Sequence, residues 1–236
     1  MASPISCPYA EKYPMSGVQF TTHTGEIHAV NHAFVDVGDF YYLFDRPFVR
    51  YRSAPPPTTA TASIIRWLAV PPAAKVIEVC CGPGYPGLST FGLGAEAVTF
   101  VDINPECLES ARLSARLSGV EDRCRFIQSD LFENVPPETF DTIIINPPYW
   151  DAARETPQDA WRFDPGFALQ QGFLDRCLDY LSPGGIINFV SVMGIVERAR
   201  TWIADRPGLT ILQEDVDEWV PGREGTWIWA IKIGRA

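Results

Sequence analysis

The clearest chemical signal in the sequence is a glycine-rich turn between two candidate strands. Gly82, Gly84 and Gly87 have the spacing G-x-G-x-x-G and follow the apolar run Val76–Val79. Asp102 ends the next apolar run, where an acid can accept hydrogen bonds from both hydroxyls of a ribose. The pattern predicts a turn that binds a nucleoside, and a tight turn without a ligand is the alternative.

The residues around this turn discriminate between two kinds of nucleoside ligand. A pyrophosphate needs backbone N–H donors, which Pro83 and Pro86 lack. Glu78, Asp102 and Asp130 would place three carboxylates near the same ligand. These charges repel a dinucleotide such as NAD or FAD and attract a ligand that carries an ammonium and a sulfonium group. We therefore expect S-adenosylmethionine (SAM) as the cofactor.

A second motif follows the buried apolar run Phe140–Ile145. It reads Asn146-Pro147-Pro148-Tyr149, with Trp150 directly after it. The carboxyl end of a strand beside a glycine turn is where a doubly wound sheet binds its ligands. Because prolines cannot donate hydrogen bonds, this corner of the chain presents acceptor oxygens.

Acceptor oxygens suit a nitrogen nucleophile. The side-chain oxygen of Asn146 and the carbonyl of Pro147 can accept two N–H groups and direct the nitrogen lone pair at the sulfonium carbon. Transfer is then an in-line displacement that depends mainly on orientation. Tyr149 supplies a face for stacking and cation–π attraction, and Trp150 extends that wall toward the substrate. A rigid turn without chemistry is the alternative.

With the glycine turn and its acids, residues 75–236 resemble the class I SAM-dependent methyltransferases. The resemblance implies that Glu78 and the glycine turn meet the methionine end of the cofactor and that Asp102 holds the ribose. It implies adenine contacts from the residues after the second and third strands. Cys80 departs from the family, which usually has glycine at that position. The implied cofactor contacts are Glu78, Cys80, Gly82, Gly84, Asp102, Ile103, Asp130, Leu131 and Asn146.

The Asn-Pro-Pro-Tyr motif is similar to that of the amino-methyltransferase branch of this family, which modifies several kinds of nitrogen. A small-molecule amine is the favoured substrate, and a protein glutamine amide is an alternative. The net charge of −10 disfavours nucleic acid. Intramolecular cyclisation of SAM to azetidine-2-carboxylate, with release of methylthioadenosine, and a binding protein without catalysis also stay open.

Residues 1–53 differ from the rest of the chain in their aromatic and histidine content. We expect them to form a lid that caps the substrate, ahead of a SAM-binding domain over residues 54–236. Tyr42 and Arg50 are candidate substrate contacts, because a guanidinium can hold a substrate carboxylate and the aromatic run around Tyr42 can line a substrate-binding wall. The three histidines at 23, 28 and 32 are not expected to bind metal, which methyl transfer does not need.

The remaining sequence predicts the elements that carry these residues. Apolar runs at 76–79, 98–101, 125–127, 142–145, 186–190, 209–212 and 227–231 alternate with helical patterns at 61–69, 106–117, 167–181 and 196–205. This order predicts a doubly wound, Rossmann-like α/β fold with a seven-stranded, mostly parallel sheet. The short link before the last strand indicates an antiparallel C-terminal hairpin. With no signal peptide and no apolar run of about 18 residues, we expect a cytoplasmic protein that does not cross a membrane.

Overall fold

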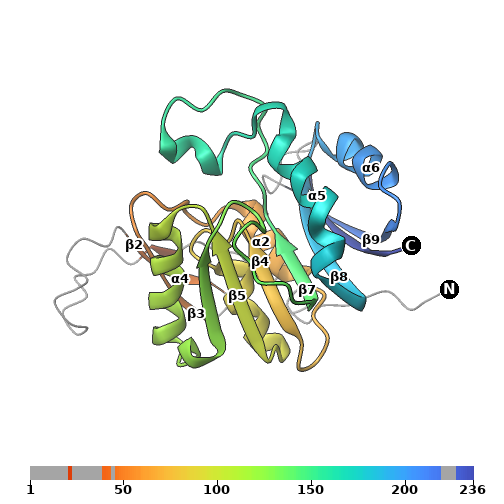
Figure 1. Ribbon diagram of the computed structural model, residues 1–236. Coiled ribbons are helices and arrows are strands. Elements are labelled where there is room, and N and C mark those ends of the chain that lie inside the picture. Colours follow the sequence, from red (N-terminus) through yellow and green to blue (C-terminus); the bar gives the residue numbers. More distant parts are fainter. Residues whose placement is uncertain (1–20, 23–38, 44–45, 219–226) are drawn as a thin grey trace.

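The computed structural model describes residues 21–22, 39–43, 46–218 and 227–236, and Figure 1 follows the chain through its elements. Among these residues, the main sheet has seven strands in the order β6-β5-β4-β7-β8-β10-β9. Strands β6, β5, β4, β7 and β8 are parallel, while β10 pairs antiparallel with both β8 and β9. The predicted fold class, including the antiparallel C-terminal hairpin, is confirmed. The strands are β4 (Lys75–Val79), β5 (Ala97–Asp102), β6 (Cys124–Gln128), β7 (Phe140–Ile145), β8 (Leu181–Val192), β9 (Leu209–Glu218) and β10 (Trp227–Arg235).

Helices cover both faces of this sheet. The apolar sides of α2 (Thr59–Arg66), α3 (Tyr85–Ser89) and α4 (Pro105–Leu117) pack into one core on one face. Those of α5 (Ala168–Tyr180) and α6 (Val196–Ala204) pack into a second core on the other face. Strands β4, β5 and β7 are therefore buried between two helical layers, which explains why their sequences are largely apolar, while the edge strand β6 is only partly buried.

Local capping explains where two of these helices begin. The side chain of Asn104 accepts the N–H of Glu106 at 2.9 Å, and Pro105 occupies the first helical position of α4. Thr58 forms a capping box with Thr61, so α2 begins at Thr59, earlier than predicted. Helix α2 also ends earlier, because the backbone N–H and carbonyl of Ala69 bond to the side chain of Asn188 instead of continuing a helix.

The described part of the N-terminal segment forms a separate three-stranded sheet of β1 (Thr21–Thr22), β2 (Asp39–Leu43) and β3 (Arg46–Arg50). Strand β3 lies against α4, where the backbone N–H of Val49 donates to Ser114 Oγ at 2.8 Å. Phe48 is fully buried in the same core as α2, α3 and α4. This strand is thus packed onto the main domain, and the division at residue 53 stays a prediction.

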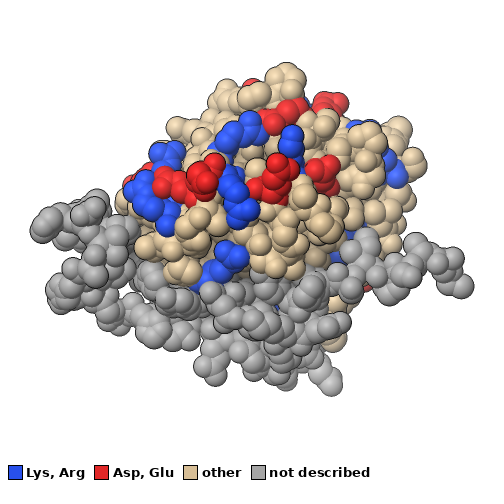
Figure 2. Space-filling view, turned by 90° about the horizontal axis from the view of Figure 1, so that it is seen from below, with Lys and Arg blue, Asp and Glu red and all other residues tan. Residues whose placement is uncertain are grey.

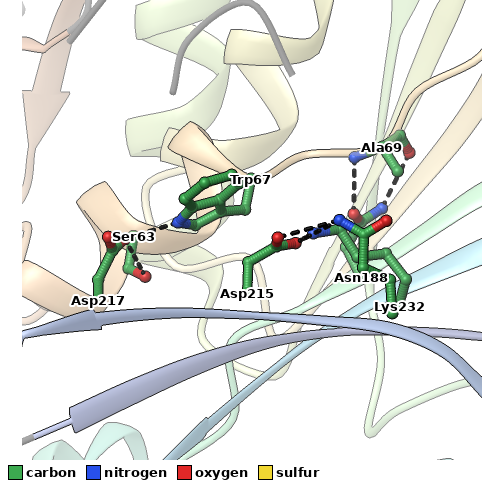
Figure 3. Close-up of polar contacts among 8 residues, drawn as sticks. Ser63, Trp67, Ala69, Asn188, Asp215, Asp217 and Lys232 are labelled. Atoms are coloured by element: carbon green, nitrogen blue, oxygen red, sulfur yellow. Dashed lines mark hydrogen bonds and ion pairs between the residues drawn. The ribbon is translucent and has the colours of Figure 1, made fainter. Parts of the chain in front are cut away.

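A buried polar cluster ties α2 to the C-terminal hairpin (Figure 3). Asp217 on β9 pairs with Arg66 and accepts hydrogen bonds from Ser63 Oγ and Trp67 Nε1, each at 2.8 Å. Asp215 on β9 pairs with Lys232 on β10, whose side chain is 1% exposed. The Lys232 ammonium lies 5.5 Å from the centre of the Trp67 ring. The cluster fixes the position of α2 against the antiparallel half of the sheet.

Charges on the surface of the described residues are interleaved. Figure 2 shows basic and acidic side chains alternating on the face that it presents. Ion pairs such as Arg116–Glu121 and Arg125–Glu138 match this pattern. None of the described helices combines the length and the hydropathy that a membrane span requires. The cytoplasmic location stays a prediction.

Candidate functional site

The predicted site residues meet at one edge of the sheet. The glycine turn follows β4, Asp102 ends β5, Asp130 comes shortly after β6, and Asn146 follows β7. These four strands are neighbours in the sheet and run parallel, so their carboxyl ends lie side by side. This is the edge at which doubly wound sheets bind ligands.

Close packing explains the glycines of the turn. Gly84 has φ of +78°, and a Cβ there would lie 2.9 Å from the Phe100 ring. At Gly87 a Cβ would lie 2.5 Å from Glu78 Oε2, so any side chain would displace the buried acid beneath. Only glycine lets the start of α3 sit directly on β4 and β5.

Glu78 lies beneath this turn. Its side chain is 1% exposed, and Oε2 accepts the backbone N–H of Gly87 at 2.9 Å. Burial raises the pKa of Glu78 well above its usual value, against the lowering effect of the Gly87 hydrogen bond. The Glu78 carboxyl is thus hydrogen-bonded to Gly87 of the glycine turn. Its contact with the methionine end of a cofactor stays a prediction.

Asp102 joins the turn to the end of β5. Its carboxylate accepts the backbone N–H of Gly82 at 2.8 Å and that of Asn104 at 2.9 Å. Burial raises the pKa of Asp102, and these two hydrogen bonds oppose the rise. The next side chain, Ile103, is 54% exposed, which is unusual for isoleucine and suits a residue that packs on a flat ring. Asp130 is exposed, and Leu131 beside it has φ of +45°.

Cys80 stands in a left-handed backbone conformation, with φ of +55°. A position of this kind favours glycine, which explains physically why glycine is the usual residue there. Burial raises the pKa of the Cys80 thiol well above its usual value, and the charges of Asp102, Asp130 and Asp164 raise it further. Three carboxylates and one opposing cation, Arg154, therefore act on this position, and this excess of negative charge fits a ligand with a positive charge.

The Asn-Pro-Pro-Tyr corner is compact. Pro147 and Pro148 are buried, and the Tyr149 hydroxyl donates a hydrogen bond to Asn146 Oδ1. Burial raises the pKa of Tyr149 far above its usual value, so the phenol keeps its proton. Trp150 is exposed at the rim. The corner thus presents one amide oxygen, already oriented by a phenol, beside the glycine turn.

The two residues predicted in the N-terminal segment lie differently. Arg50 Nη1 donates to the carbonyls of Ala54, at 2.8 Å, and Arg52, at 3.4 Å, so this guanidinium supports its own turn. Tyr42 pairs with Pro47 between β2 and β3, and its side chain lies outside the described residues. Substrate contacts by Tyr42, Arg50 and Trp150 stay predictions. The histidines at 23, 28 and 32 also lie outside the described residues. Among the described residues, no group of His, Cys, Asp or Glu could hold a metal.

Sequence reasoning missed a segment that lies over the glycine turn. A Cβ on Gly82 would lie 3.1 Å from the Pro55 ring, and the Tyr85 hydroxyl donates to the Pro55 carbonyl at 3.4 Å. No pattern in the sequence indicates that this proline-rich stretch contacts the glycine turn. Sequence reasoning also did not identify Gln170 on α5 and Asp164 just before that helix, which support the Asn-Pro-Pro-Tyr corner.

Comparison with protein families gives one match that includes both motifs. The family model for the methyltransferase small domain matches residues 56–194. This range holds the glycine turn, Asp102, Asp130 and the Asn-Pro-Pro-Tyr corner.

Several curated proteins are similar over the same region. The chain is 34% identical over 100 residues to the ribosomal protein uL3 glutamine methyltransferase of Francisella tularensis, covering 42% of this chain and 32% of that protein. It is 34% identical over 122 residues to a putative protein N5-glutamine methyltransferase of Methanocaldococcus jannaschii, covering 49% and 60%. It is 35% identical over 113 residues to the release factor glutamine methyltransferase of Leptospira interrogans, covering 46% and 38%. The match thus spans about a third to three fifths of these relatives.

Solved structures agree on the fold. A ribosomal protein L11 methylase from Lactobacillus delbrueckii superimposes with a TM-score of 0.57 at 20% identity, covering 75% of this chain and 77% of that one. A tRNA methyltransferase of Methanocaldococcus jannaschii gives a TM-score of 0.61 at 16% identity, covering 83% and 54%. At these identities the likeness concerns the fold alone.

Proposed function

The chain belongs to the methyltransferase small domain family, and from that premise we propose that it transfers a methyl group from SAM to a nitrogen atom. The prediction of SAM as the cofactor is confirmed at the level of the family. The observation that carries the choice of nitrogen is the corner at the end of β7, where Asn146 and Tyr149 lie beside the glycine turn.

The residues of the edge fit this cofactor. In this proposal Asp102 accepts the ribose hydroxyls, the exposed face of Ile103 packs on the adenine, and the carboxylates around Cys80 attract the positive charges. When bound, SAM supplies a methyl group made electrophilic by a positively charged sulfur.

The chain's own contribution to transfer is orientation and electrostatic support. Asn146 Oδ1 accepts the Tyr149 hydroxyl and keeps a second lone pair for an N–H of the acceptor. The Pro147 carbonyl is a second acceptor. Because neither proline has a backbone N–H, this corner offers the substrate only acceptor groups from these two residues. These oxygens stabilise the positive charge that develops on the nitrogen, and the partly buried Tyr149 adds a face against which a planar group can stack.

We propose the side-chain amide of a protein glutamine as the acceptor. Its planar nitrogen carries two N–H groups, which matches the two acceptor oxygens, and three similar proteins are named as glutamine methyltransferases. The comparisons give no support to the small-molecule amine that the sequence alone favours. That amine is the second candidate, because the carboxylates around Cys80 would also attract a cationic substrate.

Product analysis by mass spectrometry tests this proposal. The purified protein would be incubated with SAM alone, with glutamine-containing peptides, with the same peptides carrying glutamate instead, and with primary amines. We expect S-adenosylhomocysteine and a peptide heavier by one methyl group only when glutamine is present, and about 10²-fold less product, or lower still, with Asn146→Ala. Methylation of amines alone would support the second candidate. Methylthioadenosine released from SAM alone would overturn methyl transfer in favour of cyclisation.

A further inference from the structure

The backbone on both sides of Tyr149 is bonded to one later segment of the chain. Before it, the Pro148 carbonyl accepts Gln170 Nε2 at 2.9 Å. After it, the Trp150 N–H donates to the Arg162 carbonyl at 3.1 Å, and the Trp150 carbonyl accepts the Asp164 N–H at 2.8 Å. Figure 1 shows the chain between β7 and α5 running out beyond the sheet and returning into α5. Tyr149 is therefore held at the base of this excursion.

Gln170 is itself fixed by the start of α5. Its side chain is fully buried, and its backbone N–H donates to Asp164 Oδ2 at 3.1 Å. The other carboxylate oxygen of Asp164 accepts the Leu169 N–H at 2.9 Å. Asp164 thus contacts both residues that flank the Tyr149 support: its side chain binds the backbone of Gln170, and its backbone N–H binds the carbonyl of Trp150.

The side-chain amide of Gln170 is only partly satisfied by hydrogen bonds. Its Oε1 is buried and has no hydrogen-bond partner within the described residues. An unpaired buried oxygen costs free energy, whereas an apolar side chain of similar size would avoid that cost. The side-chain amide nitrogen donates to the carbonyl of Pro148, a residue that lacks an N–H, and the side chain also acts on Asp164. The bond to Pro148 therefore sets the orientation of the peptide that leads into Tyr149.

We propose that Gln170, held by Asp164, is a positioning residue that orients Tyr149 and, through the Tyr149 hydroxyl, the acceptor oxygen of Asn146. The inference rests on the proposed function, since it concerns the same acceptor corner. It assigns to α5 a part in nitrogen methylation that lies outside both sequence motifs.

The neighbouring Gln171 offers a matched control. Its Nε2 donates to the carbonyls of Gly166, at 3.1 Å, and Phe167, at 3.4 Å, and so supports α5 without touching the motif. Gln170→Met is expected to lower kcat by about tenfold to hundredfold, the scale of a small misplacement of reacting groups. Its affinity for S-adenosylhomocysteine should stay at the wild-type value, and Gln171→Met should keep the wild-type kcat.

Gln170→Glu adds a test that a merely structural role would not pass. The introduced carboxyl can donate to the Pro148 carbonyl only when protonated, and it lies beside the carboxylate of Asp164, with the Arg154 cation acting on the same group. Its kcat relative to wild type should therefore rise as the pH falls. A wild-type kcat in Gln170→Met, or a pH profile of Gln170→Glu parallel to that of wild type, would overturn the proposal.

Hydrogen exchange separates this proposal from the proposed function. The amide of Trp150 should exchange faster in Gln170→Met than in wild type and be unchanged in Gln171→Met. Unchanged exchange in Gln170→Met would refute the support by Gln170 even in an active enzyme. Faster exchange in a protein that methylates no nitrogen acceptor would instead refute the proposed function and, with it, the catalytic part of this inference. If Gln170→Met does not fold, the Gln170→Glu profile decides.

Discussion

The Tyr149 hydroxyl donates a hydrogen bond to the side-chain oxygen of Asn146, three residues earlier in the chain. Because only the oxygen of the amide can accept this bond, the bond fixes the orientation of the Asn146 side chain with Oδ1 facing the phenol. Burial keeps the Tyr149 proton in place, so the donor is constant across ordinary pH. The acceptor corner is therefore organised by the motif itself, and its two polar residues can be tested separately.

Removing the amide tests the acceptor directly. Asn146→Ala is expected to lower kcat by about 10²-fold or more, the scale of losing one oriented polar group. Steady-state kinetics and calorimetric binding of S-adenosylhomocysteine measure the two quantities, and the cofactor affinity should change little. Retained turnover would remove Asn146 from the acceptor site.

Removing only the hydroxyl tests its orienting bond. Tyr149→Phe keeps the ring and should lower kcat by about tenfold, less than Asn146→Ala, because the amide oxygen loses its partner but stays in place. The double variant should be no slower than Asn146→Ala, since the hydroxyl acts through the amide. Additive losses of the two variants would show that Tyr149 acts independently.

Asp102 is predicted to bind cofactor and to hold the turn. Asp102→Asn keeps one carbonyl oxygen and removes the charge, so the affinity for S-adenosylhomocysteine should weaken by about 1–3 kcal/mol. The exposed Asp122, at the end of the chain segment after α4, gives the control Asp122→Asn. Equal affinities of Asp102→Asn and wild type would exclude the carboxylate from the site.

The sequence predicts the strands and motifs of this site better than the long-range contacts that hold them. Apolar runs identify all seven strands of the main sheet, and residues that follow parallel strands must share one edge. The turn glycines and Asn146 could therefore be placed from their position along the chain. The helical pattern predicted at 106–117 also gives the start of α4, Pro105, to within one residue.

Partners that are far apart in the sequence could not be predicted. Gln170 and Pro148 meet only because α5 returns to the end of β7, and no local pattern encodes that contact. The hydrogen bond from the Gly87 backbone N–H to Glu78 was also not predicted. It forms because Gly87 packs directly on the Glu78 carboxyl. Lys232 reads as an ordinary charged residue, although its pairing with Asp215 allows it to be buried.

Cys80 gives a prediction about backbone strain. Because its φ is +55°, Cys80→Gly should relieve strain and raise the free energy of unfolding by about 1 kcal/mol. Cys80→Ala keeps the Cβ and removes only the thiol, so it should bring no such gain. Urea unfolding of the three proteins measures the difference. A gain in Cys80→Ala equal to that in Cys80→Gly would assign the effect to the thiol instead.

Glu78 predicts a pH dependence of stability. Its pKa is raised in the folded state, so the folded protein holds this proton at pH values where the unfolded chain has lost it. The associated stability is present below the unfolded pKa of about 4.3 and is lost as the pH rises toward the folded pKa. Glu78→Gln carries no such proton, and its stability relative to wild type should increase with pH.

Thermal unfolding from pH 4 to pH 9 measures this difference, with the exposed Glu133→Gln as the control. The Glu133 variant should follow the wild-type curve at every pH. A constant offset between Glu78→Gln and wild type would mean that the two side chains differ only in packing or hydrogen bonding.

The buried pair of Lys232 and Asp215 predicts strong coupling between two strands of the hairpin. Each single variant, Lys232→Met or Asp215→Asn, should reduce the free energy of unfolding by about 3–5 kcal/mol, because the remaining partner is buried without its counter-charge. Asp215 is 13% exposed, so the loss in Lys232→Met should lie toward the lower end.

The double variant should lose much less than the sum of the single losses, since it leaves no unpaired charge in the interior. Urea unfolding of the four proteins gives the coupling energy. The Lys232 ammonium also lies 5.5 Å from the centre of the ring of Trp67, the residue that caps the end of α2, so Lys232→Met should loosen α2 as well as the hairpin. Hydrogen exchange at α2 follows that effect. Additive single losses with unchanged exchange at α2 would mean that the pair contributes no more than two independent surface charges.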